Sequence, residues 1–433
     1  MDFPIKNDKS TIRSWAMFDW ANSVYNLVIT STIFPVYYVT ITSTEAMGDK
    51  VSFFGFTFVN TALSNFALSV AYLLMALSLP FLSAYADLKG KKHLFMRVFT
   101  YIGAAACMGL FFFTLETLEL GIFFFALAAM GYIGGVAFNN AYLPLIATED
   151  QQDAVSAKGF AYGYVGCVTL QLICLVIIFK PEWFGIYDSS LPPRISFLLV
   201  GVWWALFSLI PFKALPKIPS SEKTSGTRFH KKAVSELKEV VSRIRKIPSI
   251  RRFLVPYFFY SMGVQTLMIV ATAFGEKVLN LGAAKLIGTI LLIQLVAILG
   301  AVIMAKASKK MGNLNVLLIN VGIWVLICVS AYFLRYEWQF YVLAVMVGAL
   351  MGGIQSLSRS TYSKFLPKDI IDTASFFSFY DVTEKVAIVF GLFSFAIIEQ
   401  VTDNIRNSAL FLSLFFILGF IFLLRMIRKE TLG

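Results

Sequence analysis

The chain has 433 residues, of which 58% are hydrophobic and only 14% are charged, and its formal net charge is +12. A soluble chain must keep a polar surface, so this composition excludes an ordinary soluble protein. The basic residues are spread over connecting segments and are not gathered with aromatic residues on one face. We therefore expect them to face anionic lipid headgroups and not nucleic acid. The composition predicts an all-α protein embedded in a lipid bilayer.

Twelve apolar stretches are long enough to cross a hydrocarbon core, which needs about 20 helical residues. They are 15–40, 60–86, 94–115, 120–146, 158–180, 195–213, 252–275, 284–305, 314–334, 338–364, 374–400 and 407–427. With a cytoplasmic N-terminus, the gaps on the cytoplasmic side hold 29 of the 37 Lys and Arg. The positive-inside rule then predicts a multi-pass protein of the cell membrane with both termini in the cytoplasm. The first 14 residues lack the pattern of a removable signal peptide, so we expect the first helix to be retained.

The widest cytoplasmic gap divides the chain into two units of six helices. We predict an N-terminal half at 1–213, a linker at 214–251 and a C-terminal half at 252–433. In the linker, Val234, Leu237, Val241 and Ile244 recur at helical spacing. This pattern predicts an amphipathic helix on the membrane face, and a solvated charged connector is the alternative.

The two halves share sequence features at nearly constant offsets. The pair Gly134–Gly135 returns as Gly352–Gly353, 218 residues later, and the turn ending at Gly90 resembles the turn ending at Gly312, 222 residues later. Two similar offsets indicate a duplicated six-helix unit. Because six crossings return the chain to the same side, the copies form a parallel repeat about an axis along the membrane normal. Paired glycines also have a simpler role, since they let helices approach closely.

Asn, Gln and ionisable side chains are nearly absent from the interior of every third helix. The third, sixth, ninth and twelfth crossings contain essentially one, Asn320, whereas each of the other eight contains at least one. Polar groups in lipid are costly, so these eight helices are predicted to line a water-filled path between the halves. The candidates for solute or ion binding are Asp19, Asn22, Tyr25, Asn139, Asn140, Gln265, Gln355, Arg359, Tyr380, Asp381, Glu384 and Lys385.

The eleventh helix carries three charged residues near the middle of the bilayer. Asp381 precedes Lys385 by one helical turn, which predicts an ion pair that orients the helix. Glu384 has no cation one turn ahead, so its charged form is disfavoured and we expect it to be a proton carrier. The alternative is a purely structural ion pair that joins helices.

Asp19 and Asn22 lie one turn apart on the first helix and are predicted to face the space between the halves. A cavity or gate role for Asp19 competes with an interfacial carboxylate paired with a loop lysine. Arg359, near the cytoplasmic end of the tenth helix, is expected to bind an anionic group or close a cytoplasmic gate. Anchoring to phosphate headgroups is its alternative.

The turn after the second crossing reads Ser83-Ala-Tyr-Ala-Asp87-Leu-Lys-Gly90-Lys91-Lys92. It resembles the signature Gly-x-x-x-Asp-Arg-x-Gly-Arg-Arg of major facilitator transporters. Asp87 is able to accept hydrogen bonds from the N-terminus of a neighbouring helix, and Gly90 permits a tight turn, which together predict a latch that forms in one state and breaks in another. A simple basic turn is the alternative. Lys309 stands at the position of Asp87 in the second half, so we expect an asymmetric latch.

A closer resemblance covers nearly the whole chain. The segments that carry it are Trp15-Ala-Met-Phe-Asp19-Trp-Ala-Asn22-Ser23, Phe138-Asn139-Asn140-Ala-Tyr-Leu-Pro144, Ser156-Ala-Lys158-Gly159-Phe-Ala-Tyr-Gly163-Tyr164, Trp203-Trp204, Gly353-Ile-Gln355-Ser-Leu-Ser358-Arg359-Ser360 and Phe376-Phe-Ser-Phe-Tyr380. They resemble the unknown-major-facilitator branch, which includes the vacuolar amino-acid exporter of autophagy. The resemblance implies the major facilitator fold, with 12 transmembrane helices in two pseudo-symmetric halves. Ser261-Met262-Gly263 replaces the family's Asn-Asp-Gly run in the seventh helix, so a carboxylate is missing there.

Catalytic patterns are lacking. The two histidines, His93 and His230, lie in connectors without a catalytic, phosphate-binding or metal-ligand motif, and the four cysteines lie in apolar helices without metal-ligand spacing. We therefore expect no enzyme, cofactor or metal, but a monomeric secondary transporter that moves a small solute, such as an amino acid or related metabolite, with protons as coupling ions. A lipid or lysolipid facilitator of the same fold is one alternative, and a membrane enzyme or receptor is another.

Overall fold

A computed structural model describes residues 5–43, 48–218, 240–367 and 371–431. The first half contains α1 (Lys9–Val24), η1 (Tyr25–Ile33), α2 (Phe34–Thr42), β1 (Lys50–Phe53), β2 (Phe56–Val59), α3 (Asn60–Leu88), α4 (Lys92–Gly109), η2 (Leu110–Phe112), η3 (Leu115–Thr117), α5 (Leu118–Asn140), α6 (Leu143–Ile146), α7 (Gln152–Phe179), η4 (Pro181–Phe184), α8 (Leu191–Phe207) and α9 (Leu209–Ala214). The second half contains α11 (Pro248–Leu279), α12 (Ala283–Met311), α13 (Asn313–Tyr332), α14 (Glu337–Lys364), α15 (Thr373–Thr402) and α16 (Ile405–Thr431).

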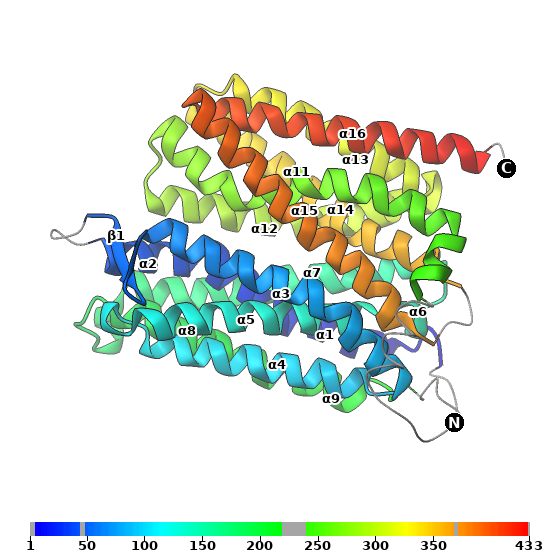
Figure 1. Cartoon of the computed structure of the whole chain (residues 1–433), viewed down its shortest axis with the longest axis horizontal. Helices are drawn as coiled ribbons and strands as arrows, with labels where there is room; N and C mark the ends of the chain where they lie inside the picture. The colour runs from blue at the N-terminus through cyan, green and yellow to red at the C-terminus, as the bar shows by residue number, and fades with distance from the viewer. Residues whose placement is uncertain (1–4, 44–47, 219–239, 368–370, 432–433) are drawn as a thin grey trace.

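Twelve membrane-length helical segments run side by side in the described part of the chain (Figure 1). Eleven of them are apolar enough to be recognised as spans by hydropathy and charge content. The remaining one, α15, is 30 residues long and carries three charged residues in its middle, Asp381, Glu384 and Lys385. These charges face other helices in the bundle, which explains how so polar a helix crosses the membrane. The predicted all-α fold of twelve crossings is confirmed.

The first span contains a stretch of π-helix that the apolar pattern did not predict. In η1 the Ser31 hydroxyl donates to the carbonyl of Asn26 at 2.9 Å, and the Thr32 hydroxyl donates to the carbonyl of Leu27 at 2.8 Å. Both bonds reach back five residues, so these hydroxyls satisfy carbonyls of the widened helix. Such π-helical turns are frequent at functional sites.

A short antiparallel hairpin, also unpredicted, follows the first span. Strand β1 pairs with β2 so that Val51 lies opposite Phe58 and Phe53 opposite Phe56. The turn places Phe54 and Gly55 at positive φ, 47° and 81°. The gap contains too few residues for periodicity to distinguish a two-stranded hairpin from a loop.

The glycines of the internal repeat have structural roles. Gly90 and Gly312 end the two corresponding turns at φ values of 62° and 79°, a region that favours glycine. A Cβ atom on Gly352 would lie 2.2 Å from the carbonyl oxygen of Ala297, so this glycine lets α14 and α12 pack backbone to backbone. The simpler reading of the paired glycines, close helix approach, therefore applies at this position.

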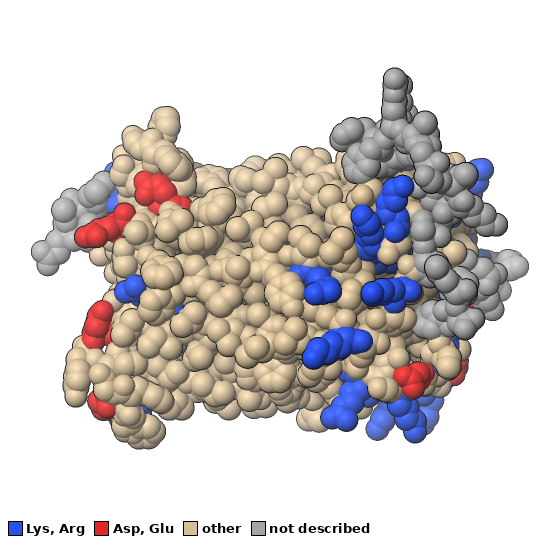
Figure 2. All heavy atoms as spheres, turned by 90° about the horizontal axis from the view of Figure 1, so that it is seen from below, with Lys and Arg blue, Asp and Glu red and all other residues tan. Residues whose placement is uncertain are grey.

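The two ends of the bundle differ in charge. Lys and Arg side chains gather toward the end where Figure 1 shows both chain termini, as Figure 2 shows for one face. We call this the basic end and the opposite one the distal end. In the linker, Val234 and Leu237 lie outside the described residues, whereas Val241 is half-buried and Ile244 is buried. Arg243 of the linker forms an ion pair with Asp372, 2.5 Å apart, just before α15.

Candidate functional site

A cavity of about 710 Å³ lies between the two halves. All eight helices predicted to line a path contribute to its wall, whereas α4, α8 and α13 contribute nothing and α16 only Ile405 among the described residues. The prediction that every third helix is an outer one agrees with this lining. Nine predicted site residues border the cavity: Asp19, Asn140, Gln265, Gln355, Arg359, Tyr380, Asp381, Glu384 and Lys385.

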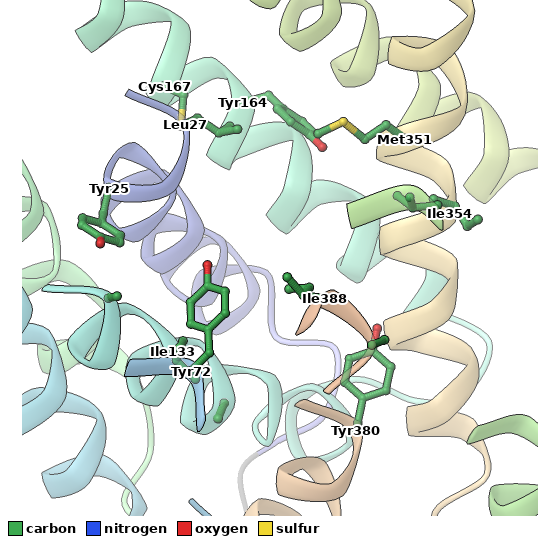
Figure 3. Close-up of a cluster of buried hydrophobic side chains, with 14 of the residues drawn as sticks. Tyr25, Leu27, Tyr72, Ile133, Tyr164, Cys167, Met351, Ile354, Tyr380 and Ile388 are labelled. Atoms are coloured by element: carbon green, nitrogen blue, oxygen red, sulfur yellow. The ribbon is translucent and has the colours of Figure 1, made fainter. Parts of the chain in front are cut away.

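Tyrosines from both halves lie at and around the cavity wall. Figure 3 shows Tyr72 of α3, Tyr164 of α7 and Tyr380 of α15 approaching the space between the halves from different sides. Tyr380 stacks on Tyr257 of α11 with ring centroids 4.3 Å apart, and the Tyr164 hydroxyl donates to Gln355 at 2.8 Å. The wall thus offers aromatic faces and polar groups to a solute.

The charged cluster of α15 is paired differently from the prediction. Lys385 Nζ lies 2.6 Å from Glu384 Oε2, and the amide of Gln265 donates to Glu384 Oε1 at 2.7 Å. The prediction of an Asp381–Lys385 ion pair is therefore wrong. Glu384, expected to carry the proton because no cation lies one turn ahead of it, is instead paired with the lysine next to it. Neighbouring helical residues point about 100° apart, but these two long side chains converge on the cavity.

Asp381 is consequently the carboxylate without an ion pair among the described residues of the cavity. It is buried, and its Oδ1 accepts a 3.3 Å hydrogen bond from the Asn140 amide of α5. Its Oδ2 makes no hydrogen bond in the described structure. The nearest cations, Lys385 and Arg359, are each bonded to another carboxylate. A buried carboxylate with one hydrogen bond is suited to taking up and releasing a proton.

Arg359 closes the cavity at the side of the basic end. Its Nη1 lies 3.1 Å from Asp19 Oδ2 of α1, and its Nε and Nη2 donate to the hydroxyl and carbonyl of Ser156 on α7, both at 2.9 Å. Because α14 belongs to one half and α1 and α7 to the other, these bonds join the halves. Arg359 is only 3% exposed, which excludes the alternative of anchoring to lipid phosphates in this state.

Aromatic rings and one glycine shape the space around this ion pair. The Arg359 guanidinium lies 4.7 Å from the ring centroid of Trp15 and 4.3 Å from that of Phe160. A Cβ atom on Gly159 would lie 2.3 Å from Asp19 Oδ2 and 2.8 Å from Arg359 Nη2. Only a glycine at this position leaves room for the Asp19–Arg359 pair as it stands.

Three predicted site residues do not border the cavity. Asn22 is buried inside the first half, which corrects the prediction that it faces the space between the halves. The Tyr25 hydroxyl donates to the carbonyl of Phe125 at 3.1 Å, and the Asn139 amide donates to Asp19 at 3.4 Å. Asn139 thus hydrogen-bonds the carboxylate of the Asp19–Arg359 ion pair, whereas Asn22 and Tyr25 pack inside the first half.

The gating turn makes the contacts expected of a closed latch. Asp87 Oδ2 accepts bonds from the backbone amide and hydroxyl of Ser375, at 2.7 and 2.6 Å, in the first turn of α15. Lys92 pairs with Asp87 at 2.9 Å and also donates to the carbonyl of Ile371 and the hydroxyl of Thr373. Both Asp87 and Lys92 are buried, whereas Lys91 is exposed. The latch therefore closes the basic end between α3 and α15.

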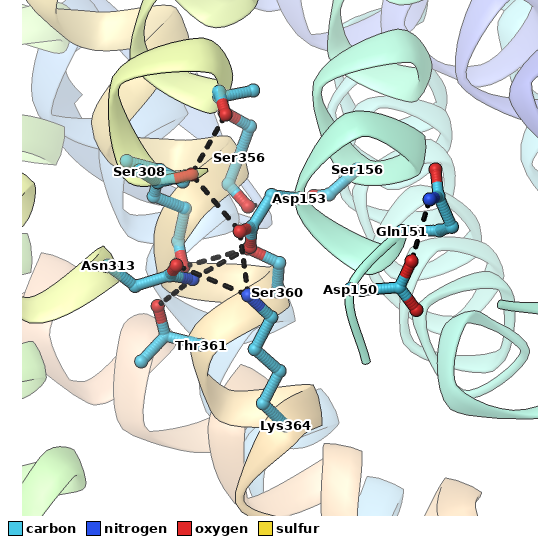
Figure 4. A network of polar contacts seen from close by, with 12 residues as sticks. Asp150, Gln151, Asp153, Ser156, Ser308, Asn313, Ser356, Ser360, Thr361 and Lys364 are labelled. Carbon is cyan, nitrogen blue, oxygen red and sulfur yellow. Dashed lines mark hydrogen bonds and ion pairs between the residues drawn. The ribbon is translucent and has the colours of Figure 1, made fainter. Parts of the chain in front are cut away.

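A second group of polar contacts, which we call the Asp153 clamp, joins the halves at the basic end, where α7 meets α12, α13 and α14. The sequence did not predict it. Asp153, at the start of α7, accepts bonds from Ser308 of α12 at 3.0 Å and Asn313 of α13 at 2.7 Å (Figure 4). Lys364 of α14 lies 2.6 Å from the same carboxylate. Lys309 stands where the repeat would place an aspartate, but the carboxylate comes instead from the opposite half. In the sequence, Asp153 is visible only as one more aspartate beside a cytoplasmic loop.

We expect Asp153→Asn to loosen the basic end. The change leaves the partly exposed Lys364 without its carboxylate and weakens the bonds that Ser308 and Asn313 donate to Asp153, so contacts between the halves are lost. Ser360, which is buried behind the clamp, reports this when replaced by cysteine. In vesicles whose basic end faces the bulk solution, alkylation of that cysteine by a membrane-impermeant reagent should become about tenfold faster or more, which corresponds to about 1.4 kcal/mol.

The matched control for this experiment is Asp150→Asn. Asp150 lies three residues away, is exposed, and accepts a hydrogen bond from its neighbour Gln151 at 2.7 Å (Figure 4). It should leave the alkylation rate unchanged. Equal rates for Asp153→Asn and Asp150→Asn would show that the clamp does not hold the halves together.

Comparison with known proteins places this architecture in a family. Residues 7–431 match the family described as "Vacuole effluxer Atg22 like". The chain belongs to this family. An uncharacterized transporter of the major facilitator type from Bacillus subtilis, YxiO, is 29% identical over 419 residues, which cover 96% of this chain and 95% of that protein. Autophagy-related protein 22 of Cryptococcus neoformans is 30% identical over 277 residues, covering 60% of this chain and 50% of that protein.

Solved structures confirm the fold of this Atg22-like protein. The human organic anion transporter MFSD10 has a TM-score of 0.74 at 11% identity and covers 97% of this chain and 100% of its own. The major facilitator transporter FucP in the outward conformation has a TM-score of 0.67 at 14% identity, covering 96% of this chain and 98% of its own. Together with the family match and the Bacillus subtilis relative, this fold supports the prediction of a transporter of the major facilitator type and not an enzyme.

Proposed function

We propose that this Atg22-like protein is a secondary transporter that moves a small zwitterionic or cationic solute by alternating access, coupled to protons through Asp381. The observation that carries the proposal is the cavity between the halves, which contains the Glu384–Lys385 pair and the unpaired Asp381. The cavity reaches Thr61 and Ile405 near the distal end. At the basic end it is closed by the Asp19–Arg359 pair, the Asp87 latch and the Asp153 clamp. This arrangement is that of a state open at the distal end.

The charges of the cavity favour a zwitterion or a cation over an anion. Two ion pairs, Asp19–Arg359 and Glu384–Lys385, are neutral overall, so Asp381 alone decides the net charge at the centre. A zwitterion that separates Glu384 from Lys385 replaces one ion pair by two, without leaving a charge unpaired. Amino acids are the first solutes to test, because the chain resembles an amino-acid exporter and the cavity has this charge pattern.

Uptake into proteoliposomes tests the proposed function. With a set of amino acids and related metabolites outside, one or more should accumulate when a pH gradient is imposed and should only equilibrate without the gradient. A solute that accumulates should also exchange with its unlabelled form. Proteoliposomes that neither accumulate nor exchange any of these solutes would contradict the proposal.

We further propose that the basic end lies in the cytoplasm, because basic residues accumulate on cytoplasmic loops. A reporter that is active only outside the cytoplasm should then be inactive when fused after Gly433. The same reporter inserted near Asp188, in the distal connection before α8, should be active. The reverse pattern would show that the chain is oriented the other way.

A further inference from the structure

We infer that the cavity has a second, lateral entrance between the distal halves of α3 and α15, which admits a single-chain zwitterionic amphiphile from the surrounding lipid. This inference rests on the proposed function, since it places the zwitterionic head group at the Glu384–Lys385 pair and adds an apolar chain to the substrate class. Two seams join the halves, α7 against α12 and α14, and α3 against α15, and they differ in how far toward the distal end they are bonded.

The seam formed by α7 against α12 and α14 is bonded along most of its length. From the basic end it carries the Asp153 clamp, the Ser156–Arg359 bonds and the Tyr164–Gln355 bond. Toward the distal end, Gln294 of α12 donates to Gln171 of α7 at 3.1 Å, and both side chains are buried. Gln171 lies eight residues, or about 12 Å of helix, from the distal end of α7. This seam is closed almost to the distal surface.

The seam formed by α3 against α15 is closed only over its basic half. The Asp87–Ser375 latch holds its basic end, and the Lys385 ammonium lies 5.8 Å from the ring centroid of Tyr72. Lys385 is 17 residues, or about 26 Å of helix, from the distal end of α15. Between residues 60–71 and 386–402, all of which the structure describes, no hydrogen bond or ion pair crosses the seam. Figure 1 shows α3 and α15 diverging toward the distal end.

The face of α15 that contacts α3 continues into this gap and becomes apolar. Val389 and Phe393 follow Lys385 at intervals of four residues, so all three lie on one stripe of the helix. Val389 is 39% and Phe393 66% exposed, and both border the cavity. On α3, Phe66 also borders the cavity and is 59% exposed. The wall of the cavity therefore extends, on both helices, out to apolar side chains at the surface of the bundle.

The combination of charged centre and apolar edge determines the occupant. A head group with both charges suits the Glu384–Lys385 pair, and a hydrocarbon chain suits the stripe of Val389 and Phe393. A fully polar solute bound at the pair would make no apolar contact with these side chains, whereas a hydrocarbon chain attached to the head group would pack against them. The test also has two other outcomes. An ordinary bilayer lipid seals the gap without reaching the cavity, or the gap has no specific occupant.

The test measures the binding of lysophosphatidylcholines with 8, 10 and 12 carbons to the full chain in nanodiscs. Radiolabelled 12-carbon lysophosphatidylcholine, used below its micellar concentration, is displaced by each member of the series and by glycerophosphocholine, with empty nanodiscs subtracted. Affinity should rise by up to about fourfold per methylene group buried. Glycerophosphocholine, which has the head group alone, should compete far more weakly than the 12-carbon compound.

Two double variants and one matched control locate the chain. Phe66→Ser with Phe393→Ser should weaken binding of the 12-carbon compound about tenfold and flatten the chain-length dependence, whereas Phe66→Leu with Phe393→Leu should retain both. The control is Phe123→Ser on α5. Phe123 is 57% exposed and lies as close to the distal end of its helix as Phe66, but it does not border the cavity.

Equal binding by the serine double variant and the Phe123→Ser control would overturn the lateral entrance, because it would assign the affinity to general partitioning into lipid. Lack of saturable binding would overturn it as well. Exchange of small solutes is measured on the same preparations. If exchange persists while the lysophosphatidylcholines do not bind, only the lateral entrance fails, and if no solute exchanges in any preparation, the proposed function fails.

Discussion

Replacing Asp381 with Asn should abolish accumulation of solute driven by a pH gradient and leave exchange of solute intact. The amide cannot ionise, so the carrier cannot alternate between protonated and deprotonated states. It preserves the size of the side chain and an oxygen able to accept the hydrogen bond from Asn140, which is 3.3 Å from Asp381 in the structure. Uptake and exchange in proteoliposomes, each measured across a range of external pH, separate the two effects.

The control for this prediction is Glu384→Gln on the same helix. It removes the partner of Lys385, 2.6 Å away, and so should weaken exchange and accumulation together. A variant Asp381→Asn that still concentrates solute with an unchanged pH dependence would exclude Asp381 as the proton carrier. Loss of exchange together with accumulation would instead assign Asp381 to solute binding.

Replacing Arg359 with Ala should open the basic end. The change leaves Asp19 buried without its cation and removes the bonds to Ser156 that join the halves. Breaking a buried ion pair costs about 3–5 kcal/mol, so the equilibrium should shift toward the state open at the basic end by about 100-fold or more. Nitroxide labels on cysteines at Lys91 and Lys310, both exposed and on different halves, should report a longer distance. The four native cysteines are buried, which limits background labelling.

Two further variants separate charge from shape at this gate. Arg359→Lys keeps the charge but loses the forked geometry that reaches Asp19 and Ser156 together, so it should give an intermediate shift. Gly159→Ala should act like Arg359→Ala although it changes no charge, because its Cβ would overlap Asp19 and Arg359. An unchanged label distance in both Arg359→Ala and Gly159→Ala would mean that the Asp87 latch and the Asp153 clamp close the basic end without the Asp19–Arg359 pair.

The helices were predictable from sequence because lipid imposes a strong requirement on them. Every backbone group in the bilayer needs an internal partner, so each long apolar stretch must be a helix. The predicted crossing at 60–86, for example, corresponds to α3 at Asn60–Leu88. The duplicated turns were also visible, because glycine is needed where φ is positive, as at Gly90 and Gly312.

The partners of the charged side chains were not predictable to the same degree. Spacing along one helix favoured pairing of Lys385 with Asp381. In the structure, the flexible side chain of Lys385 pairs with Glu384 instead, and the Gln265 amide from α11 also bonds that carboxylate. Asp153 looked like an ordinary loop residue, because its partners Ser308, Asn313 and Lys364 lie on three other helices. Contacts between helices far apart in sequence carry no periodic signal in a single chain.

The most direct test of alternating access is a pair of distances measured in the same preparation. One pair of nitroxide labels joins Lys91 to Lys310 at the basic end, and the other joins Tyr187 to Arg335, exposed residues on different halves at the distal end. On addition of a transported solute at low pH, the fraction of molecules with a long distance at the basic end should increase. The fraction with a short distance at the distal end should increase with it. Distances that stay fixed at both ends, or lengthen together at both, would contradict the account.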